Sequence, residues 1–291
     1  MKWEPGADEI RRAPFGRGPE PLKVFAIGDL HLSHRAGKPM DVFGEQWRGH
    51  ADRIAGNWRE RVSQADLVLV PGDISWAMRI EEAEEDLAWL DRLPGRKVIL
   101  KGNHDYWWPS ISRLRRRLEG TSVAALQYDS LRVGPVAVAG TRLWSLPDAE
   151  GLPPDPLEAI PGERLPDAGD GLSAGPGEEN RSHEEKIFRR EIGRLEQSLK
   201  SLDPEAGMRI AMTHFPPTNE WGVETVATRI LEKYGVRICV FGHLHNLPLP
   251  RGRTWDFVRN GVRYVLASCD AVQFSPYLIL EIGSGETGPD T

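Results

Sequence analysis

Short runs of apolar and β-branched residues recur along the chain, and each predicts a buried strand. Between several of these runs, apolar residues recur at every third or fourth position, which is the spacing of a helix with one buried face. The alternation of strands with helices predicts an α/β architecture built on a largely parallel sheet. The last two predicted strands are joined by a short link and are expected to pair as a hairpin. The predicted strands cover 22–28, 67–71, 97–101, 135–140, 208–213, 237–242, 262–268 and 277–282, and the predicted helices cover 43–63, 80–92, 181–202 and 223–234.

Three segments depart from this pattern. Residues 1–21 and 286–291 lack periodic apolar positions, and we interpret them as tails on either side of one domain over 22–285. The segment 146–180 holds seven prolines and six glycines, a composition that cannot form a core. We therefore expect a surface insertion there, with a lid over a site as the alternative.

The composition is that of an ordinary globular protein, with 40% hydrophobic and 27% charged residues. The formal net charge is −6, and the 146–180 insertion alone contributes −8 through nine acidic residues and one arginine. Because the remainder is nearly neutral, charge does not indicate a nucleic-acid surface, although it leaves one possible.

The longest apolar runs are too short to span a membrane, so no membrane partner is expected. With only two cysteines, the expected location is a reducing cytoplasm.

Side chains that commonly bind metal ions follow five of the predicted strands. The carboxyl ends of strands form the ligand-binding edge of an open α/β sheet, so these side chains are expected to meet there. Glycines at positions 28, 72, 102 and 242 precede them and allow the backbone to turn sharply and approach a bound group. The motifs are Asp29-Leu30-His31, Gly72-Asp73, Gly102-Asn103-His104-Asp105, His214 and Gly242-His243-Leu244-His245.

The spacing within these motifs favours more than one metal ion. Residues i and i+2 of an extended segment project to the same side, so Asp29 with His31, and His243 with His245, can each face one ion or two adjacent ions. The whole set exceeds what one tetrahedral ion can accept and suits two neighbouring ions that share a bridging carboxylate. Because the set contains no thiolate, manganese, iron or zinc is expected, with magnesium or nickel as alternatives.

The order of these motifs resembles that of the calcineurin-like metallophosphoesterase superfamily, over about residues 22–285. Segments such as IGDLHLS (27–33), PGDISWAM (71–78) and KGNHDYWW (101–108) further resemble a bacterial branch of predicted phosphohydrolases. The resemblance implies a four-layer α/β/β/α sandwich, in which the C-terminal strands belong to a second sheet.

The resemblance also implies a role for each residue of the motifs. One ion would be held by Asp29, His31 and His245, and the other by Asn103, His214 and His243, with Asp73 bridging both. His104 resembles the family's catalytic histidine that does not bind metal, and Asp105 resembles the acid that orients it.

Two further residues are candidate substrate contacts. Trp107 follows the third motif directly and could stack against a flat leaving group, or could pack between the sheet and its helices. Arg142 ends a predicted strand and could bind a phosphate through both guanidinium nitrogens, or could form a surface ion pair.

These observations predict a phosphoesterase that hydrolyses a phosphodiester or a phosphomonoester by attack of a metal-bridging hydroxide, with His104 as general acid or charge stabiliser. The expected partner is a small or medium phosphate ester. One alternative is a nuclease or nucleotide-processing phosphodiesterase, since RLRRR (113–117) is a local basic cluster. Another is a catalytically silent metal-binding scaffold for a protein partner. The natural substrate, the choice between diester and monoester, and the oligomeric state stay open.

Overall fold

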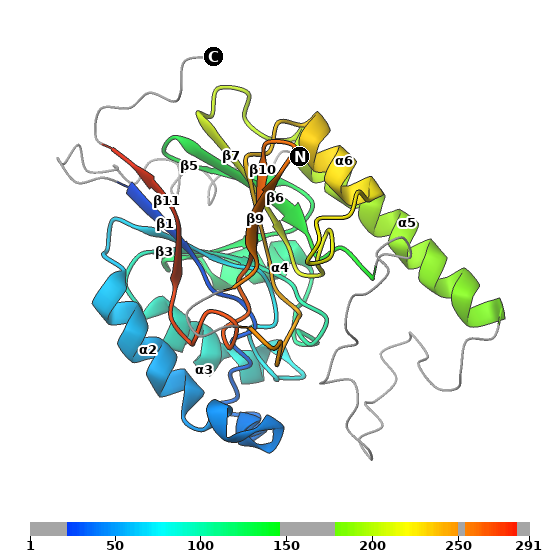
Figure 1. Cartoon of the computed structure of the whole chain (residues 1–291). Helices are drawn as coiled ribbons and strands as arrows, with labels where there is room; N and C mark the ends of the chain where they lie inside the picture. The colour runs from blue at the N-terminus through cyan, green and yellow to red at the C-terminus, as the bar shows by residue number, and fades with distance from the viewer. Residues whose placement is uncertain (1–21, 146–177, 250–253, 284–291) are drawn as a thin grey trace.

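The computed structural model describes residues 22–145, 178–249 and 254–283 (Figure 1). The tails expected at 1–21 and 286–291, and most of the 146–180 insertion, lie outside these residues. The strands are β1 Leu22–Ala26, β2 Leu67–Val70, β3 Arg96–Leu100, β4 Val123–Leu126, β5 Ser130–Val133, β6 Val136–Thr141, β7 Met208–Thr213, β8 Ile238–Phe241, β9 Asp256–Arg259, β10 Val262–Leu266 and β11 Tyr277–Ile282. The helices are α2 His50–Arg61, α3 Ile80–Asp91, α4 Ile111–Arg117, α5 Glu178–Lys200 and α6 Val226–Lys233, with short 3-10 turns η1 Met40–Phe43 and η2 Glu45–Trp47.

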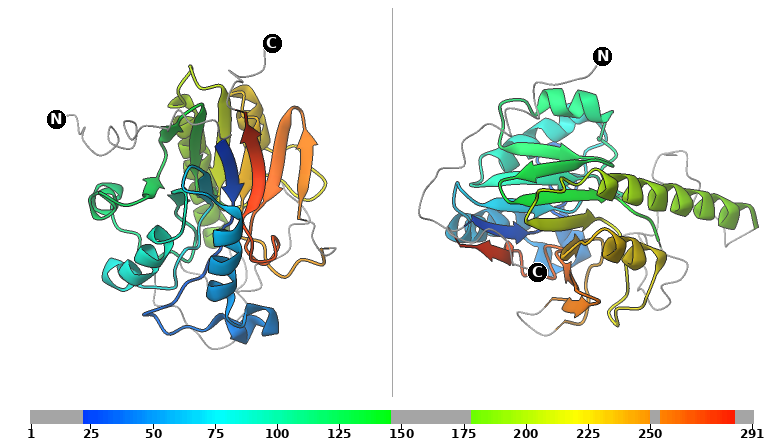
Figure 2. Two further views of the ribbon diagram at one scale, coloured as in Figure 1. Left: turned by 90° about the vertical axis from the view of Figure 1, so that its left-hand side faces the viewer. Right: turned by 90° about the horizontal axis from the view of Figure 1, so that it is seen from above.

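The strands form two mixed sheets that lie face to face, as Figure 1 and Figure 2 show. The first sheet has the order β11-β1-β2-β3-β4, and the second has the order β5-β6-β7-β8-β10-β9. Helices α2, α3 and α4 cover the outer face of the first sheet, and α5 and α6 cover the outer face of the second. The four-layer α/β/β/α sandwich is therefore confirmed.

The alternation of side chains along each strand builds three separate apolar cores. On β1, Val24 and Ala26 point between the two sheets, whereas Phe25 points toward the helices over the first sheet. On β6, Val136 and Val138 point between the sheets, and Ala137 and Ala139 point toward α5. Burial on both faces explains why the strands read as almost continuous apolar runs in the sequence.

The expected hairpin between the last two strands is wrong. β11 pairs antiparallel with β1 in the first sheet, while β10 lies in the second sheet, parallel to β8. The hairpin partner of β10 is the short strand β9, across a turn at Asn260 and Gly261. Both turn residues have positive φ, of 46° and 78°, which is the backbone that an Asn-Gly dipeptide favours in tight hairpins. That dipeptide is the signal that should have located the hairpin.

The predicted helix over 43–63 is shorter than expected. Residues 40–47 form two 3-10 turns, and α2 begins only at His50 after a left-handed residue, Gly49. The short strands β4, β5 and β9 were not predicted, because four-residue segments with mixed burial give little periodicity.

Backbone hydrogen bonds tie the two sheets together at the carboxyl ends of β1 and β10. The amide of Gly28 donates to the carbonyl of Ala267 at 2.7 Å, and the amide of Cys269 donates to the carbonyl of Gly28 at 3.0 Å. This joint brings the loop after β1 in the first sheet against the loops that follow the strands of the second.

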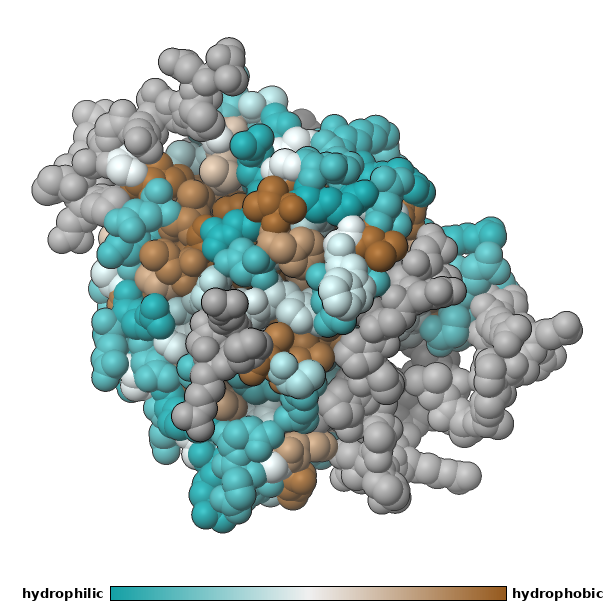
Figure 3. Space-filling view, viewed as in Figure 1, coloured by the Kyte–Doolittle hydropathy of each residue, from teal (hydrophilic) through white to brown (hydrophobic). Residues whose placement is uncertain are grey.

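The surface is mainly hydrophilic on the face shown in Figure 3, with hydrophobic residues in several separate patches. Within the described ranges, none of the helices combines the length and the apolar character needed to cross a membrane. The apolar residues are instead concentrated in the three cores.

Candidate metal centre

The seven predicted metal ligands come together where the two sheets are joined. β1, β2 and β3 run parallel in the first sheet, as do β7 and β8 in the second, so the loops at their carboxyl ends meet at one edge. Six of the seven side chains are buried, and Asn103 is half-buried. The seven are Asp29, His31, Asp73, Asn103, His214, His243 and His245.

One cluster consists of Asp29, His31 and His245, whose ligand atoms all lie within 4.8 Å of one another. The Nε2 atoms of His31 and His245 are 3.3 Å apart. On the other side of its ring, His245 has Nδ1 2.9 Å from Oδ1 of Asp270. A proton on Nδ1 that is donated to this carboxylate leaves Nε2 free to bind a cation, which is how metal-binding histidines are commonly oriented.

The second cluster consists of Asp29, Asp73 and His214. His214 donates through Nδ1 to the carbonyl of Pro71 at 3.0 Å, so its Nε2 faces the cluster. This Nε2 lies 2.5 Å from Oδ1 of Asn103, and the same oxygen lies 3.2 Å from Nδ1 of His243. The predicted ligands of the second ion are therefore neighbours in space.

Asp73, a member of the second cluster, also faces the first. Its Oδ2 is 3.8 Å from Nε2 of His31 in the first cluster and 3.5 Å from Nε2 of His214 in the second. Asp29 also belongs to both clusters, whereas the resemblance assigned it to one ion.

The electrostatics of the site favour bound cations. Burial raises the pKa of Asp29 to about 7, and His245 and the backbone amide of His243 only partly offset this effect. Burial, and then the neighbouring imidazoles, hold the pKa values of His31 and His214 well below the usual range, so both rings are neutral at pH 7. Buried carboxylates beside neutral imidazoles, with no lysine or arginine in either cluster, form a donor set that fits divalent ions.

The backbone of the ligand loops adopts a conformation that non-glycine residues rarely take. Four of the seven predicted ligands have positive φ, and such strain persists where the surrounding structure fixes it, most often at functional sites. These residues are Asp29 (54°), His31 (44°), Asp73 (51°) and His243 (73°).

Two of the glycines singled out in the sequence make room for the carboxylates. A Cβ atom on Gly102 would lie 1.9 Å from Oδ1 of Asp73, and one on Gly242 would lie 2.3 Å from Oδ2 of Asp29. Both distances are far below van der Waals contact, so any side chain at either glycine would displace a predicted ligand.

His104 lies beside the two clusters without belonging to either. Its side chain is buried, its ring centroid lies 5.8 Å from that of His31, and its backbone amide donates to Oδ1 of Asp73 at 2.9 Å. Trp76, which stacks on His31 with centroids 4.8 Å apart, also lies 4.7 Å from the His104 ring.

Asp105 makes contacts that the sequence did not indicate. Its carboxylate accepts hydrogen bonds from the backbone amides of Gly102, Ile74 and Ser75 and from the indole NH of Trp107. Four donors are about as many as a carboxylate can accept. In this structure Asp105 therefore ties the loop after β2 to the loop after β3 and fixes the positions of Asp73 and Asn103.

The two candidate substrate contacts differ in position. Trp107 is 2% exposed, belongs to the core beneath the first sheet and donates to Asp105, so it offers a substrate almost no surface. Arg142 is half-buried, and its guanidinium lies 4.5 Å from the ring centroid of Trp144. Its backbone carbonyl accepts the amides of His214 and Phe215, which places it directly beside the second cluster.

Asp270 orients His245, a role that the sequence alone could not show. The available signal was its place two residues after the strand 262–268, at the same sheet edge as the ligands. Trp47 was not considered, yet its ring meets those of His31 and His245 edge-on, with centroids 6.2 and 5.5 Å away. No local sequence pattern links Trp47 to that edge, because it lies at the end of the second of two 3-10 turns and not directly after a strand.

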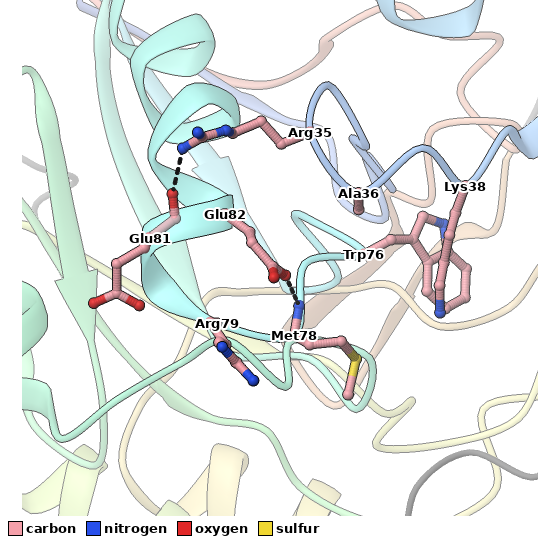
Figure 4. Close-up of a pocket in the computed structure, with 8 residues that line it drawn as sticks. All are labelled: Arg35, Ala36, Lys38, Trp76, Met78, Arg79, Glu81 and Glu82. Atoms are coloured by element: carbon pink, nitrogen blue, oxygen red, sulfur yellow. Dashed lines mark hydrogen bonds between the residues drawn. The ribbon is translucent and has the colours of Figure 1, made fainter.

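A pocket of about 570 Å³ borders the site on the side of Trp76 (Figure 4). Lys38 extends alongside the Trp76 ring, with Nζ 5.6 Å from the ring centroid. The pocket is lined by Arg35, Ala36, Lys38, Trp76, Met78, Arg79, Glu81 and Glu82.

Two buried Asp/His clusters that share the carboxylate of Asp29, at the joined edge of a four-layer sandwich, define a protein with a candidate dinuclear metal centre. The family model for calcineurin-like phosphoesterases matches residues 22–247, and the chain belongs to that family.

Known proteins resemble the chain over different extents. Proteins called Gene 66 protein are 35% identical over 83 residues in Mycobacterium phage D29 and 29% identical over 82 residues in Mycobacterium phage L5. Each match covers 28% of this chain and about two fifths of the phage protein, 40% and 39% respectively.

Among solved structures, the phosphopantetheinyl hydrolase PptH from Mycobacterium tuberculosis has the same fold, with a TM-score of 0.50 over 90% of this chain and 97% of that protein at 20% identity. The purple acid phosphatase PPD1 from yellow lupin (Lupinus luteus) seeds matches 93% of this chain and 49% of its own, with a TM-score of 0.42 and 15% identity.

Replacing Gly102 by alanine is expected to abolish tight metal binding, because the new methyl group would push the Asp73 carboxylate away. Gly56→Ala is the matched control, since a Cβ on this helical glycine meets no atom within 4 Å. Calorimetric titration with Mn²⁺ would measure both variants. Wild-type affinity in Gly102→Ala would show that Asp73 does not bind the metal.

Metal affinity is expected to weaken as the pH falls below about 7, because the raised pKa of Asp29 leaves a proton on the carboxyl that the ion must displace. The imidazoles of His31 and His214 add no such competition, since their lowered pKa values keep them neutral. Mn²⁺ titrations on both sides of pH 7 should show a loss of about tenfold per pH unit below that value. An affinity that stays constant with pH would contradict the prediction.

Proposed function

We propose that the protein is a dinuclear metal-dependent phosphoesterase that hydrolyses a phosphodiester or a phosphomonoester. The observation that carries the proposal is the position of the Asp73 carboxylate, with Oδ2 3.8 Å from Nε2 of His31 and 3.5 Å from Nε2 of His214. A carboxylate that faces a ligand of each cluster is suitably placed to bridge two ions. Membership of a family of phosphoesterases supports phosphate-ester substrates.

The nitrogen and oxygen donors of the site suit manganese, iron or zinc, with magnesium or nickel as alternatives. When bound, two such ions supply a nucleophile at neutral pH and a positive clamp for the phosphoryl oxygens. Asp29, His31 and His245 would hold one ion, and Asn103, His214 and His243 the other. The chain contributes rigidity, because Asp105 and Asp270 fix the loops and rings that carry these donors.

His104 would assist the departure of the leaving group. Its ring lies beside the clusters and against Trp76, and its backbone is held by Asp73, so the imidazole stays close to the reacting phosphate. A protonated imidazole in this position can donate its proton to the leaving oxygen or stabilise the charge that develops there.

We also propose the cytoplasm as the compartment of the protein. Both cysteines, Cys239 and Cys269, are buried free thiols, which suits a reducing environment.

The replacement Asp73→Asn is expected to remove hydrolysis of both bis-p-nitrophenyl and mono-p-nitrophenyl phosphate in the presence of Mn²⁺, because an amide cannot bridge two cations as a carboxylate does. Metal content would be measured alongside the rates. The ratio of the hydrolysis rates of the diester and the monoester in the wild type would indicate the substrate class. Full wild-type activity in the variant would refute the dinuclear mechanism. Two bound ions in the wild type without hydrolysis of either ester would favour a binding scaffold.

The replacement His104→Ala is expected to lower turnover by about 10²- to 10⁴-fold while leaving metal content unchanged, since the ring assists proton transfer without holding an ion. His183→Ala, at an exposed histidine of α5, is the control. A parallel loss of bound metal in His104→Ala would instead make His104 a ligand.

A further inference from the structure

A second pocket, of about 270 Å³, lies beside the candidate metal centre between the two sheets and α5. Two of its lining residues are directly connected to the ligand loops. Lys101 precedes Asn103 by two residues, so their Cα atoms are at most about 7 Å apart. Arg142 accepts the backbone amides of His214 and Phe215 at 3.1 and 2.9 Å. These two connections place the pocket next to the loops that carry the predicted ligands.

The pocket is strongly cationic. Its lining includes one lysine and three arginines but a single carboxylate, that of Glu191. Glu191 is 1% exposed and already accepts hydrogen bonds from Arg194 at 2.5 Å and from the hydroxyl of Thr141 at 2.7 Å. The residues that line the pocket therefore carry a formal charge of +3. The four cations are Lys101, Arg142, Arg190 and Arg194.

Lys101 is the most informative of these residues. Its side chain is half-buried, and its ammonium group interacts electrostatically with Asp105 and Glu191, whose carboxylates already accept hydrogen bonds from other groups. Desolvating a charge without a partner is unfavourable, so half-buried lysines usually meet a carboxylate. An ammonium group that lines a cavity beside carboxylates already engaged elsewhere keeps donors for an anionic ligand.

Contacts among the lining residues fix one wall of the pocket, which consists of Trp108, Gln127, Tyr128 and Arg194. The guanidinium of Arg194 lies 4.3 Å from the ring centroid of Tyr128, and the indole of Trp108 donates to Gln127 at 2.9 Å. Tyr128 itself has a φ of 53°, a strained value for a residue with a bulky side chain. Strain of this kind persists where the surroundings enforce it, which keeps the wall ready for a ligand.

We propose that this pocket binds a second phosphate of the substrate, so that the protein acts on phosphate esters that carry two phosphate groups. The inference rests on the proposed function, which places the first phosphate at the metal centre. A phosphate is favoured because a lysine and three arginines offer many donors and a charge that a dianion can neutralise. The pocket of Figure 4 is the weaker candidate for this group, since Glu81 and Glu82 nearly balance its three cations.

The test uses the Mn²⁺-loaded full chain and a series of alkane bisphosphonates of increasing length, each compared with the alkylphosphonate of the same length. Inhibition of p-nitrophenyl phosphate hydrolysis would be measured. The best-fitting bisphosphonate should bind about tenfold more tightly than its monophosphonate, as expected for one added set of charged hydrogen bonds. Lys101→Met should remove most of this preference, and Lys101→Arg, which keeps the charge, should retain it.

Arg79→Gln in the pocket of Figure 4 is the matched control and should leave the preference intact. Thermal melts would verify that each variant is folded. The inference is overturned if no bisphosphonate is preferred, if Lys101→Met keeps the preference, or if Arg79→Gln removes it. Calorimetric binding of the same compounds needs no turnover. A binding preference for the bisphosphonate without any hydrolysis would therefore refute the proposed function and support the phosphate-binding pocket. Hydrolysis without such a preference would refute the phosphate-binding pocket and leave the proposed function standing.

Discussion

The hydrogen bonds that join β1 to β10 at Gly28, Ala267 and Cys269 are the constraint on which the candidate site depends. Each sheet alone carries only part of the donor set, since the loops after β1, β2 and β3 belong to one sheet and those after β7 and β8 to the other. The joint fixes the edges of the two sheets against each other, and both clusters form across it. The candidate dinuclear centre is therefore a property of the interface between the sheets.

The joint also explains how carboxylates can be buried without neighbouring cationic side chains. Backbone amides take the place of lysine or arginine, since the amide of His243 donates to Asp29 and that of His104 donates to Asp73. These donors only partly offset the cost of burial, as the raised pKa of Asp29 shows. Glycines 102 and 242 leave the space that the carboxylates occupy. The loops are thus arranged around charges that metal ions would neutralise.

The candidate ligands could be predicted from the sequence because parallel strands align their carboxyl ends, so residues distant in the chain must meet there. Contacts that depend on which way a side chain turns could not be predicted. Asp105 contacts backbone amides of two loops, and Trp107 turns into the core to reach it. The pairing of β11 with β1 also escaped prediction, because the chain order of strands does not reveal which of two sheets a strand joins. The cationic pocket collects residues from β3, β6 and α5, which no local pattern links.

The central claim is that one carboxylate, Asp73, joins two ions at the interface of the sheets. Electron paramagnetic resonance of the Mn²⁺-saturated protein, with the metal content measured on the same sample, tests it most directly. The account predicts two ions per chain and the broadened spectrum of an exchange-coupled pair, which Asp73→Asn should convert to the signal of isolated ions. A saturated wild-type protein with one ion per chain and only an isolated-ion signal would contradict it.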